Sequence, residues 1–377
     1  GAVDGALLVI AADDGIMPQT REHLAILDLL AVSRGAIALT KIDRCEPDRV
    51  QTVIEEIKQL QATTSLKGAP IFALSNESGD GIVKLIDYLQ SQFGDDSALK
   101  ESGDDDRYFR YLIDRSFVAK GIGTVLTGSV RAGSIKTGSS LKHTASGELT
   151  KLRSARLDTT ELNEVYNGQR AAMNVSLDHK LVNRGDWLID EKLFHPINRL
   201  DATVDFIDAD FKLTSSAQYH VHIGASHHVV NIRHLGESLY QIKCLESMIA
   251  HHGDRFIVRD PASQHTLGGG RVVDIFIPRR KRSSESRLAQ LNAMQQGNID
   301  ALKQLLKIQV DGIKLQEFSI CRNISNSAIE KLLETLKQED IGFHSLNLEK
   351  SSLPVLLHEN YHSEYRNNIL SYLKDFH

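Results

Sequence analysis

The chain has 377 residues and a formal net charge of −5, so any binding of nucleic acid must come from local basic patches. Hydrophobic residues make up 41% and charged residues 25%, which is typical of globular proteins and excludes a wholly disordered, collagen-like or coiled-coil chain. No apolar run reaches the roughly 18 residues of a membrane-spanning helix, and the three cysteines show no CxxC spacing. We therefore expect a cytoplasmic, monomeric protein of two to four domains, with no membrane partner.

Residues 1–97 alternate short apolar runs with stretches of helical periodicity. The runs predict strands buried on both faces: 6–10, 36–39 and 70–74. The stretches between them predict amphipathic helices: 20–30, 49–60 and 82–89. This alternation is typical of βαβ units, so we expect part of an α/β domain with a parallel sheet.

The composition changes after residue 97. Residues 98–108 are polar and acidic, which predicts a linker. Short β-branched runs separated by glycines then follow, as in Gly-Ile-Gly-Thr-Val-Leu-Thr-Gly at 121–128. Short strands at close, regular spacing predict β-barrels, and we expect one over 109–193 and another over 194–278.

Helical periodicity dominates the rest of the chain. A basic hinge at 279–287 precedes three predicted helices and a short β-ribbon, which indicate a winged-helix module over 288–361. The predicted helices are 301–308, 315–321 and 325–338, and the ribbon strands are 346–348 and 353–357. A further module is expected to begin at 362–377. Because the chain starts at Gly1 beside a strand-like run and stops within a predicted helix, we expect it to be a fragment.

Two polar loops follow consecutive predicted strands. The first is Thr40-Lys-Ile-Asp43, in which a carboxylate can accept two N–H bonds from guanine while a lysine stem covers the base. The second is Ser75-Asn76, whose hydroxyl and backbone N–H groups can contact the guanine oxygen. The first motif alone fits an ordinary solvated loop. Ligands bind at the carboxyl ends of parallel strands, so the two loops together predict a guanine site.

These motifs resemble the translational GTPases of the elongation factor Tu class. Asp13-Asp-Gly-Ile-Met-Pro-Gln-Thr-Arg-Glu-His-Leu24 resembles the stretch after their third strand. Thr40-Lys-Ile-Asp43 resembles their Asn-Lys-x-Asp motif, and Ser75-Asn76 resembles their Ser-Ala loop. Thr40 and Asn76 depart from the common pattern, because the family usually has an amide at the first position and a small apolar residue at the second.

Within that class, the barrel sequences are similar to the selenocysteine-specific elongation factors (SelB). Arg184-Gly-Asp-Trp-Leu188 resembles their second domain, and Gly268-Gly-Gly-Arg-Val272 resembles their third. The resemblance implies that the whole protein is a GTPase using GTP and Mg²⁺, which delivers selenocysteinyl-tRNA to the ribosome at recoded UGA codons. It also implies that an mRNA hairpin is read by winged helices more C-terminal than those in this chain.

The phosphate loop pattern GxxxxGK[ST] occurs nowhere in the 377 residues, although that loop supplies the phosphate cradle and a Mg²⁺ ligand. The family's catalytic histidine belongs to a Pro-Gly-His segment that is also absent, so His23 is not given that role. We expect no catalytic residue and no GTPase activity in this chain. Its expected share of the nucleotide site reads the base: Thr40, Lys41, Asp43, Ser75 and Asn76.

The resemblance further implies a pocket for the selenocysteinyl group at Asp114, Arg115 and Arg170. A selenol is an anion at neutral pH, and a buried anion needs a positive partner, which the arginines supply. Asp114 would orient them or meet the α-amino group. An ordinary salt bridge at the barrel rim is the alternative reading of the same residues.

Other charged clusters carry weaker expectations. The run of Arg279, Arg280, Lys281 and Arg282 could contact RNA phosphates weakly, or be a solvated hinge. Residues 285–377 hold ten Lys/Arg and twelve Asp/Glu, so this module is expected to be a spacer and not the hairpin reader. The histidines near 220–228 and 251–252 lack a completing ligand set, so no metal site is expected.

Three alternatives remain open from the sequence. One is another GTPase of the same architecture, elongation factor Tu-like or initiation factor 2 gamma-like. The second is a non-catalytic RNA-binding adaptor that has lost nucleotide chemistry. The third is an unrelated transcription-like protein with winged helices, which fits poorly with two consecutive barrels.

Overall fold

The computed structural model describes residues 5–94, 106–214, 216–347 and 351–376. These fall into two compact units: one holds the parallel sheet and parts of the second barrel, and the other holds the first barrel, the rest of the second barrel and the C-terminal helices. The predicted linker at 98–108 lies mostly outside the described residues. No helix among the described residues is both long enough and apolar enough to span a membrane.

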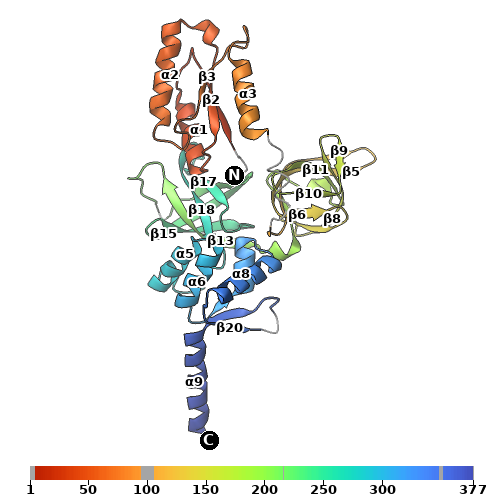
Figure 1. The fold of residues 1–377 in the computed structure, drawn as a ribbon, viewed down its shortest axis with the longest axis vertical. Helices are drawn as coiled ribbons and strands as arrows, with labels where there is room; N and C mark the ends of the chain where they lie inside the picture. Colours follow the sequence, from red (N-terminus) through yellow and green to blue (C-terminus); the bar gives the residue numbers. More distant parts are fainter. Residues whose placement is uncertain (1–4, 95–105, 215, 348–350, 377) are drawn as a thin grey trace. The chain divides into compact units, whose positions relative to one another are not determined.

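The N-terminal part is a three-stranded parallel sheet in the order β1-β2-β3, as the alternating pattern predicts. Helices α1 and α2 cover one face, where Leu24 and Ile57 pack on Ile37 and Leu39, and α3 lies on the other side (Figure 1). The elements are β1 (Ala6–Ala11), α1 (Pro18–Leu29), β2 (Gly35–Thr40), α2 (Pro47–Gln61), β3 (Ile71–Ala73) and α3 (Ile82–Phe93). Prolines at the first turns of α1 and α2 suit those positions, because their missing N–H would have no partner there.

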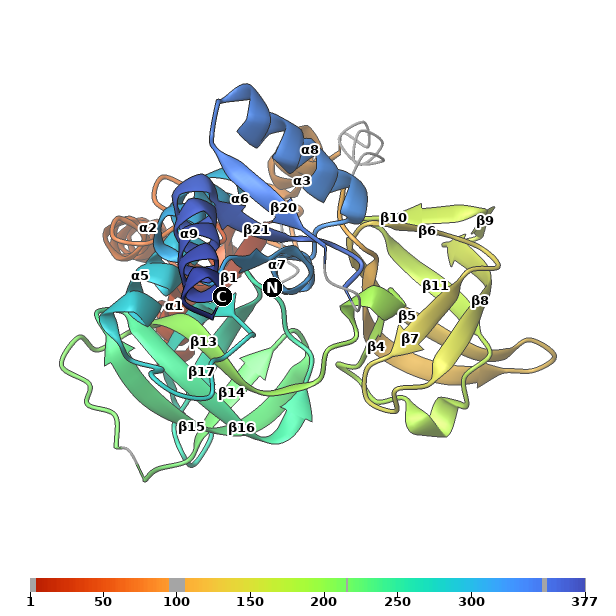
Figure 2. The same ribbon diagram turned by 90° about the horizontal axis from the view of Figure 1, so that it is seen from below.

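The first barrel runs β11-β5-β4-β12-β7-β8 and closes through pairing of β8 with β11 (Figure 2). Its interior is the apolar cluster that includes Tyr111, Leu126 and Met173, all fully buried. The strands are β4 (Arg110–Ala119), β5 (Gly123–Ala132), β6 (Ser134–Lys136), β7 (Ser140–His143), β8 (Leu149–Leu157), β9 (Thr160–Leu162), β10 (Glu164–Tyr166), β11 (Arg170–Val175) and β12 (Trp187–Ile189). Along β5 every second residue is buried, which is the period-two pattern that the sequence shows.

The second barrel is also closed, in the order β13-β16-β15-β14-β17-β18. Its strands are β13 (Ile197–Phe206), β14 (Tyr219–Ile223), β15 (Ser226–Gly236), β16 (Leu239–Met248), β17 (Arg255–Arg259) and β18 (Thr266–Asp274). The two barrels predicted from the glycine-punctuated β-branched runs are therefore both present.

A module of helices with a small sheet follows the second barrel. It contains α5 (Glu285–Met294), α6 (Asn298–Ile308), β19 (Ile313–Lys314), α7 (Leu315–Arg322), α8 (Asn326–Gln338), β20 (Phe343–Leu346), β21 (Val355–His358) and α9 (Glu359–Phe376). The sequence pattern missed α5 and β19. Helix α5 begins inside the segment predicted as a hinge, with Ser284 capping it by accepting the Arg287 N–H. Strand β19 has two residues, too few for a period to be visible.

Helix α5 is held on the second barrel by a buried ionic network. Arg287 donates to Asp201 at 2.6 Å and to Asp274 at 2.9 Å, and all three residues are less than 5% exposed. Gln241 donates to the second oxygen of Asp201 at 3.0 Å. Burial favours the neutral form of Asp201 and raises its pKa, whereas for Arg287 the two carboxylates outweigh the effect of burial and raise the pKa of the guanidinium. The network therefore fixes the first turn of α5 against β13 and β18.

A second set of bonds links the start of the first barrel to the loop between α7 and α8. Asn323 accepts the Tyr108 N–H at 3.1 Å and donates to the Tyr108 carbonyl at 3.1 Å. The Tyr108 hydroxyl donates to Asn326 at 2.8 Å, and Lys331 pairs with Asp106 at 2.8 Å. Asn323 can adopt its left-handed backbone, with φ of 52°, because asparagine tolerates this conformation.

Candidate functional site

The two predicted base-reading loops lie at one edge of the parallel sheet. Thr40 ends β2 and Ser75 follows β3 by two residues, so both stand at carboxyl ends of neighbouring strands. The backbone joins the loops directly, because the Ile42 N–H donates to the Leu74 carbonyl at 3.3 Å. The structure thus brings together the two motifs that the sequence places 35 positions apart.

The first loop turns sharply after the strand. Lys41 has a left-handed backbone with φ of 59°, and residues Ile42–Arg44 form a single 3₁₀ turn. The Thr40 hydroxyl donates to the Ile10 carbonyl at 3.3 Å, so it holds β2 to β1. The Asp43 side chain is exposed and forms no hydrogen bond or ion pair within the described ranges. It is therefore available to accept N–H groups from a ligand.

Lys41 has a partner that the sequence pattern did not indicate. Its Nζ lies 3.2 Å from Asp13 and 3.8 Å from Asp14, which follow β1 at the same edge. Partial desolvation raises the pKa of Asp13, but the bond from Lys41 and the Asp14 N–H together hold it below its usual value. The pair of acidic residues directly after a predicted strand was the available signal. The two carboxylates therefore tie the Lys41 side chain to the loop after β1.

The second loop is shaped by Ser75 itself. Ser75 is fully buried, its Oγ accepts the Ser78 N–H at 3.2 Å, and its own N–H donates to the Asp80 carbonyl at 3.1 Å. Gly81, the residue before α3, has φ of 73°, and a Cβ there would lie 2.1 Å from the Ala73 oxygen. Asn76 is exposed. Ser75 therefore builds the loop, and Asn76 presents its side chain on the surface.

The predicted anion pocket lies on the wall of the first barrel. Arg170 Nη1 forms an ion pair with Asp114 Oδ2, although the two residues are 56 positions apart. The pairing of β4 with β5 shifts between Ile113 and Arg115, so Asp114 is the extra residue of a β-bulge. Bulges re-aim side chains and are frequent at barrel rims and next to binding sites. The Asp114 and Arg170 side chains are 27% and 61% exposed, so the arginine keeps access to solvent.

A buried tyrosine supports this bulge from inside the barrel. The Tyr111 hydroxyl donates to the Ala171 carbonyl at 2.8 Å, and its oxygen lies 3.1 Å from the Leu126 carbonyl. Burial and the nearby Asp114 carboxylate raise the pKa of Tyr111. The hydroxyl is therefore neutral and ties β4 to β5 and β11 beneath the Asp114–Arg170 pair.

Arg115 is not joined to that pair. Its side chain is exposed and has no hydrogen bond or ion pair in the part of the chain that the structure describes. Of the three residues expected in the pocket, Asp114 and Arg170 are in contact and Arg115 stands next to them in the chain.

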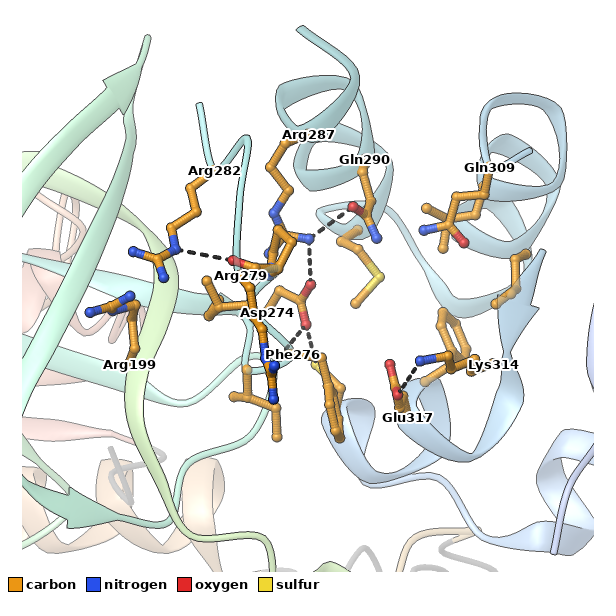
Figure 3. A pocket seen from close by; sticks show the side chains of 18 of the residues that line it. Arg199, Asp274, Phe276, Arg279, Arg282, Arg287, Gln290, Gln309, Lys314 and Glu317 are labelled. Carbon is orange, nitrogen blue, oxygen red and sulfur yellow. Dashed lines mark hydrogen bonds and ion pairs between the residues drawn. The ribbon is translucent and has the colours of Figure 1, made fainter. Parts of the chain in front are cut away.

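The basic run at 279–282 divides into two parts. Arg279 and Arg282 line a pocket of about 1010 Å³ together with Arg199 of β13, whereas Arg280 and Lys281 are exposed and do not line it (Figure 3). Arg199 was not singled out from the sequence, because an arginine on a barrel strand carries no local signal of what the fold brings against it.

Two family models match separate parts of the chain, the N-terminal α/β part and the second barrel. Residues 1–94 match the family model of the elongation factor Tu GTP binding domain. Residues 201–279 match the model of the selenocysteine-specific elongation factor, beta-barrel domain.

The similarity to whole proteins extends over nearly the full chain. The selenocysteine-specific elongation factor of Escherichia coli (strain K12) is 30% identical over 349 residues, covering 92% of this chain and 55% of that protein. A crystal structure of the bacterial selenocysteine-specific elongation factor EF-Sec superposes with a TM-score of 0.79 at 23% identity, covering 98% of this chain and 59% of that one. The elongation factor SelB of Methanococcus maripaludis, solved in complex with the GTP analogue GppNHp, gives a TM-score of 0.64 at 23% identity and covers 73% of this chain and 66% of that one. This chain thus spans little more than half the length of the Escherichia coli relative.

Proposed function

Because the chain belongs to the selenocysteine-specific elongation factors, a family of translational GTPases, we propose that the whole protein delivers selenocysteinyl-tRNA to the ribosome at recoded UGA codons. The observation that carries this proposal is the similarity over 92% of the chain, which includes a barrel model specific to that family. The alternatives of another elongation factor and of a transcription-like protein do not account for that barrel. The partners are selenocysteinyl-tRNA and the ribosome, and the protein acts as a monomer in the cytoplasm.

The nucleotide of the whole protein is GTP with Mg²⁺. The exposed Asp43 carboxylate fits the two N–H groups of guanine, and Lys41, held by Asp13, lies where its stem can cover the base. Thr40 and Ser75 set the backbone of the two loops, and Asn76 faces the same edge. A relative bound to a GTP analogue supports this assignment. Without the pattern GxxxxGK[ST], the 377 residues alone hold the base and not the phosphates.

The aminoacyl group is received at Asp114, Arg115 and Arg170. Arg170 is bonded to a single carboxylate oxygen and is more than half exposed, so it retains donors for a second anion. Exposed ion pairs add little to stability, which leaves this one free to rearrange around a ligand. A selenolate would take the remaining donors of Arg170 with Arg115 beside it, while Asp114 meets the α-amino group.

The experiment uses the whole protein and compares selenocysteinyl-tRNA with seryl-tRNA. Arg170→Ala and Arg115→Ala should each weaken binding of selenocysteinyl-tRNA by about 10- to 150-fold, since each removes a charge-assisted bond of about 1.5–3 kcal/mol. Binding of seryl-tRNA should change little, because serine has no anion. Arg156→Ala is the matched control, since Arg156 is an exposed arginine of the same barrel, paired with Glu161. Equal losses for both aminoacyl-tRNAs would show that the arginines hold the tRNA and not the selenolate.

The remaining modules follow from the same assignment. The mRNA hairpin is read by winged helices more C-terminal than the helices of this chain, and the module after the second barrel is a spacer. The basic run Arg279–Arg282 makes weak RNA contacts. We divide the chain into 1–97 (GTP-binding domain, C-terminal part), 98–108 (linker), 109–193 and 194–278 (barrels), 279–287 (hinge), 288–361 (winged helix) and 362–377 (start of a further module).

A further inference from the structure

The outer face of the second barrel carries two positively charged residues side by side, near the first turn of α5. In the register of β13 and β16, Arg199 stands directly opposite Lys243, so their Cβ atoms are neighbours. Asp201 lies two residues further along β13, on the same face, and is covered by Arg287 of α5. Arg287 of the helix therefore pairs with the charge of Asp201, whereas Arg199 on the same face lines the pocket.

The chain after β18 adds a third cation to this place. Arg282 Nε donates to the Pro278 carbonyl at 3.0 Å, which holds the side chain beside Arg199 (Figure 3). Among the residues that the structure describes, its terminal N–H groups have no hydrogen-bond partner. Burial and the approach of Arg282 both lower the pKa of Arg199, and Asp201 only partly offsets them. Arg279 lines the same pocket.

Three carboxylates line the pocket: two are ion-paired, and the third, Asp311, accepts the Tyr365 hydroxyl at 3.4 Å. Asp274 is bonded to Arg287, and Glu317 is paired with Lys314 at 2.9 Å. Within the described ranges, none of Arg199, Arg279 and Arg282 forms an ion pair, and Arg199 Nε is buried without a hydrogen-bond partner. Bringing like charges together costs free energy that an anion would recover. Arginine is the side chain best suited to phosphate, because its planar fork donates two parallel bonds.

The rest of the lining is mixed, with aromatic and apolar surface from His195, Phe276 and Val310 beside the polar Gln309, Lys314 and Glu317. His195 stacks on Phe276 with ring centroids 4.6 Å apart, and Val310 is 47% exposed. A volume of about 1010 Å³ holds more than an inorganic anion. We propose that this pocket binds a phosphate group of a single RNA strand through Arg199, Arg279 and Arg282, with the attached nucleoside against Phe276 and His195.

An RNA strand is favoured over a free nucleotide because the positive charge does not stop at the pocket. Arg280 and Lys281 continue it across the surface, as a track for neighbouring phosphates. The inference deepens the weak RNA contact of the proposed function and rests on it. It assigns the binding to a pocket that includes Arg199, a residue of a barrel strand outside the basic run.

The test measures anisotropy of a fluorescein-labelled, single-stranded RNA of about 12 nucleotides titrated with the 377-residue chain. Arg199→Gln with Arg282→Gln should weaken binding at least about tenfold at 0.15 M salt and reduce the salt slope by about 0.7 for each phosphate that the protein no longer neutralises. Arg280→Gln with Lys281→Gln removes the same charge from the track outside the pocket, and should weaken binding clearly less than the pocket variant does. Arg199→Lys keeps the charge but loses the planar fork, so its loss of RNA affinity should lie between those of the two double variants.

Equal losses in the two double variants would overturn the proposal in favour of a diffuse electrostatic effect. Displacement of the labelled RNA by submillimolar phosphate or AMP would overturn it in favour of a small-anion site. Thermal unfolding of each variant controls for folding, and relief of like-charge repulsion should leave the Gln variants at least as stable as the parent. If Arg199→Gln with Arg282→Gln leaves RNA binding unchanged while the whole protein still distinguishes selenocysteinyl-tRNA from seryl-tRNA, the pocket proposal is wrong and the proposed function stands.

Discussion

Arg110 donates from Nη1 and Nη2 to the two carboxylate oxygens of Asp254, each at 2.8 Å. The guanidinium also lies over the Trp187 ring, 4.5 Å from its centroid, and the residue is 7% exposed. Burial raises the pKa of Asp254, but Arg110 beside it holds that pKa below the usual value. The fork joins the first strand of the first barrel to the turn before β17, so it links two barrels that each have their own core.

Replacing this arginine should be costly. Arg110→Ala leaves the Asp254 carboxylate buried without its partner, and we expect the free energy of unfolding to fall by about 3 kcal/mol. Urea unfolding followed by circular dichroism measures the change. Arg156→Ala breaks an ion pair whose side chains are more than half exposed, and should cost less than about 1 kcal/mol. A similar loss in both variants would mean that the fork contributes no more than a surface pair.

Two adjacent histidines should make stability depend on pH. Burial and the nearby Arg110 lower the pKa of His251 to about 3, and burial with the nearby Arg322 lowers that of His252 to about 4. The unfolded chain binds these protons near pH 6.5 and the folded chain does not. The two histidines therefore leave the free energy of unfolding unchanged above that pH and lower it as the pH drops toward 4. The slope for each histidine approaches about 1.4 kcal/mol per pH unit.

His252→Gln tests this dependence. Glutamine can still donate to the Val273 carbonyl, which the His252 ring contacts at 3.0 Å, but it takes up no proton. Between about pH 4.5 and 6, unfolding of this variant should therefore take up nearly one proton fewer. The slope of the unfolding free energy against pH should fall by the matching amount, about 1.4 kcal/mol per pH unit. His179, whose side chain is 41% exposed, serves as the control for removal of a histidine. An unchanged slope for His252→Gln would show that this histidine is protonated in the folded protein.

Gly128 of β5 is a position at which the first barrel tolerates no side chain. A Cβ there would lie 2.0 Å from the Leu112 oxygen and 2.9 Å from Tyr111 Cζ. Gly128→Ala should destabilise the chain by about 1–3 kcal/mol and displace the strand that carries Asp114. Gly297→Ala is the control, because its nearest atom is 4.0 Å away. Thermal melts of the two variants that coincide would refute the close packing of Tyr111 under β5.

The 377-residue chain should bind GTP weakly and should not hydrolyse it. The phosphates carry most of the nucleotide's charge, and the sequence contains no GxxxxGK[ST] loop to cradle them. Calorimetry should detect no binding at micromolar GTP, and a phosphate-release assay no turnover. Micromolar affinity that Asp43→Asn abolishes would contradict this and would mean that the base-reading loops suffice.

The sequence predicts what depends on local pattern. The buried runs around Ile37 and the alternation along β5 are visible as periods in one stretch of chain, and the structure has the elements there. The Arg170–Asp114 pair was expected only through resemblance, since a bulge at Asp114 has no signature in sequence. Arg199 and Asp254 were beyond reach, because their partners lie on elements far along the chain and are brought to them only by barrel closure.

The bond between Tyr108 and Asn323 has a consequence in time. The two residues are 215 positions apart, and a ribosome adds roughly 5–20 residues per second. The start of the first barrel therefore waits roughly 10–40 s, at those rates, before the segment that secures it has been synthesised. During this interval Tyr108 and Asp106 have no docking site, although the barrel strands that follow them are complete much earlier. Nascent chains arrested before residue 323 should accordingly carry a closed first barrel with an undocked leading segment, which limited proteolysis would cut selectively near residue 106.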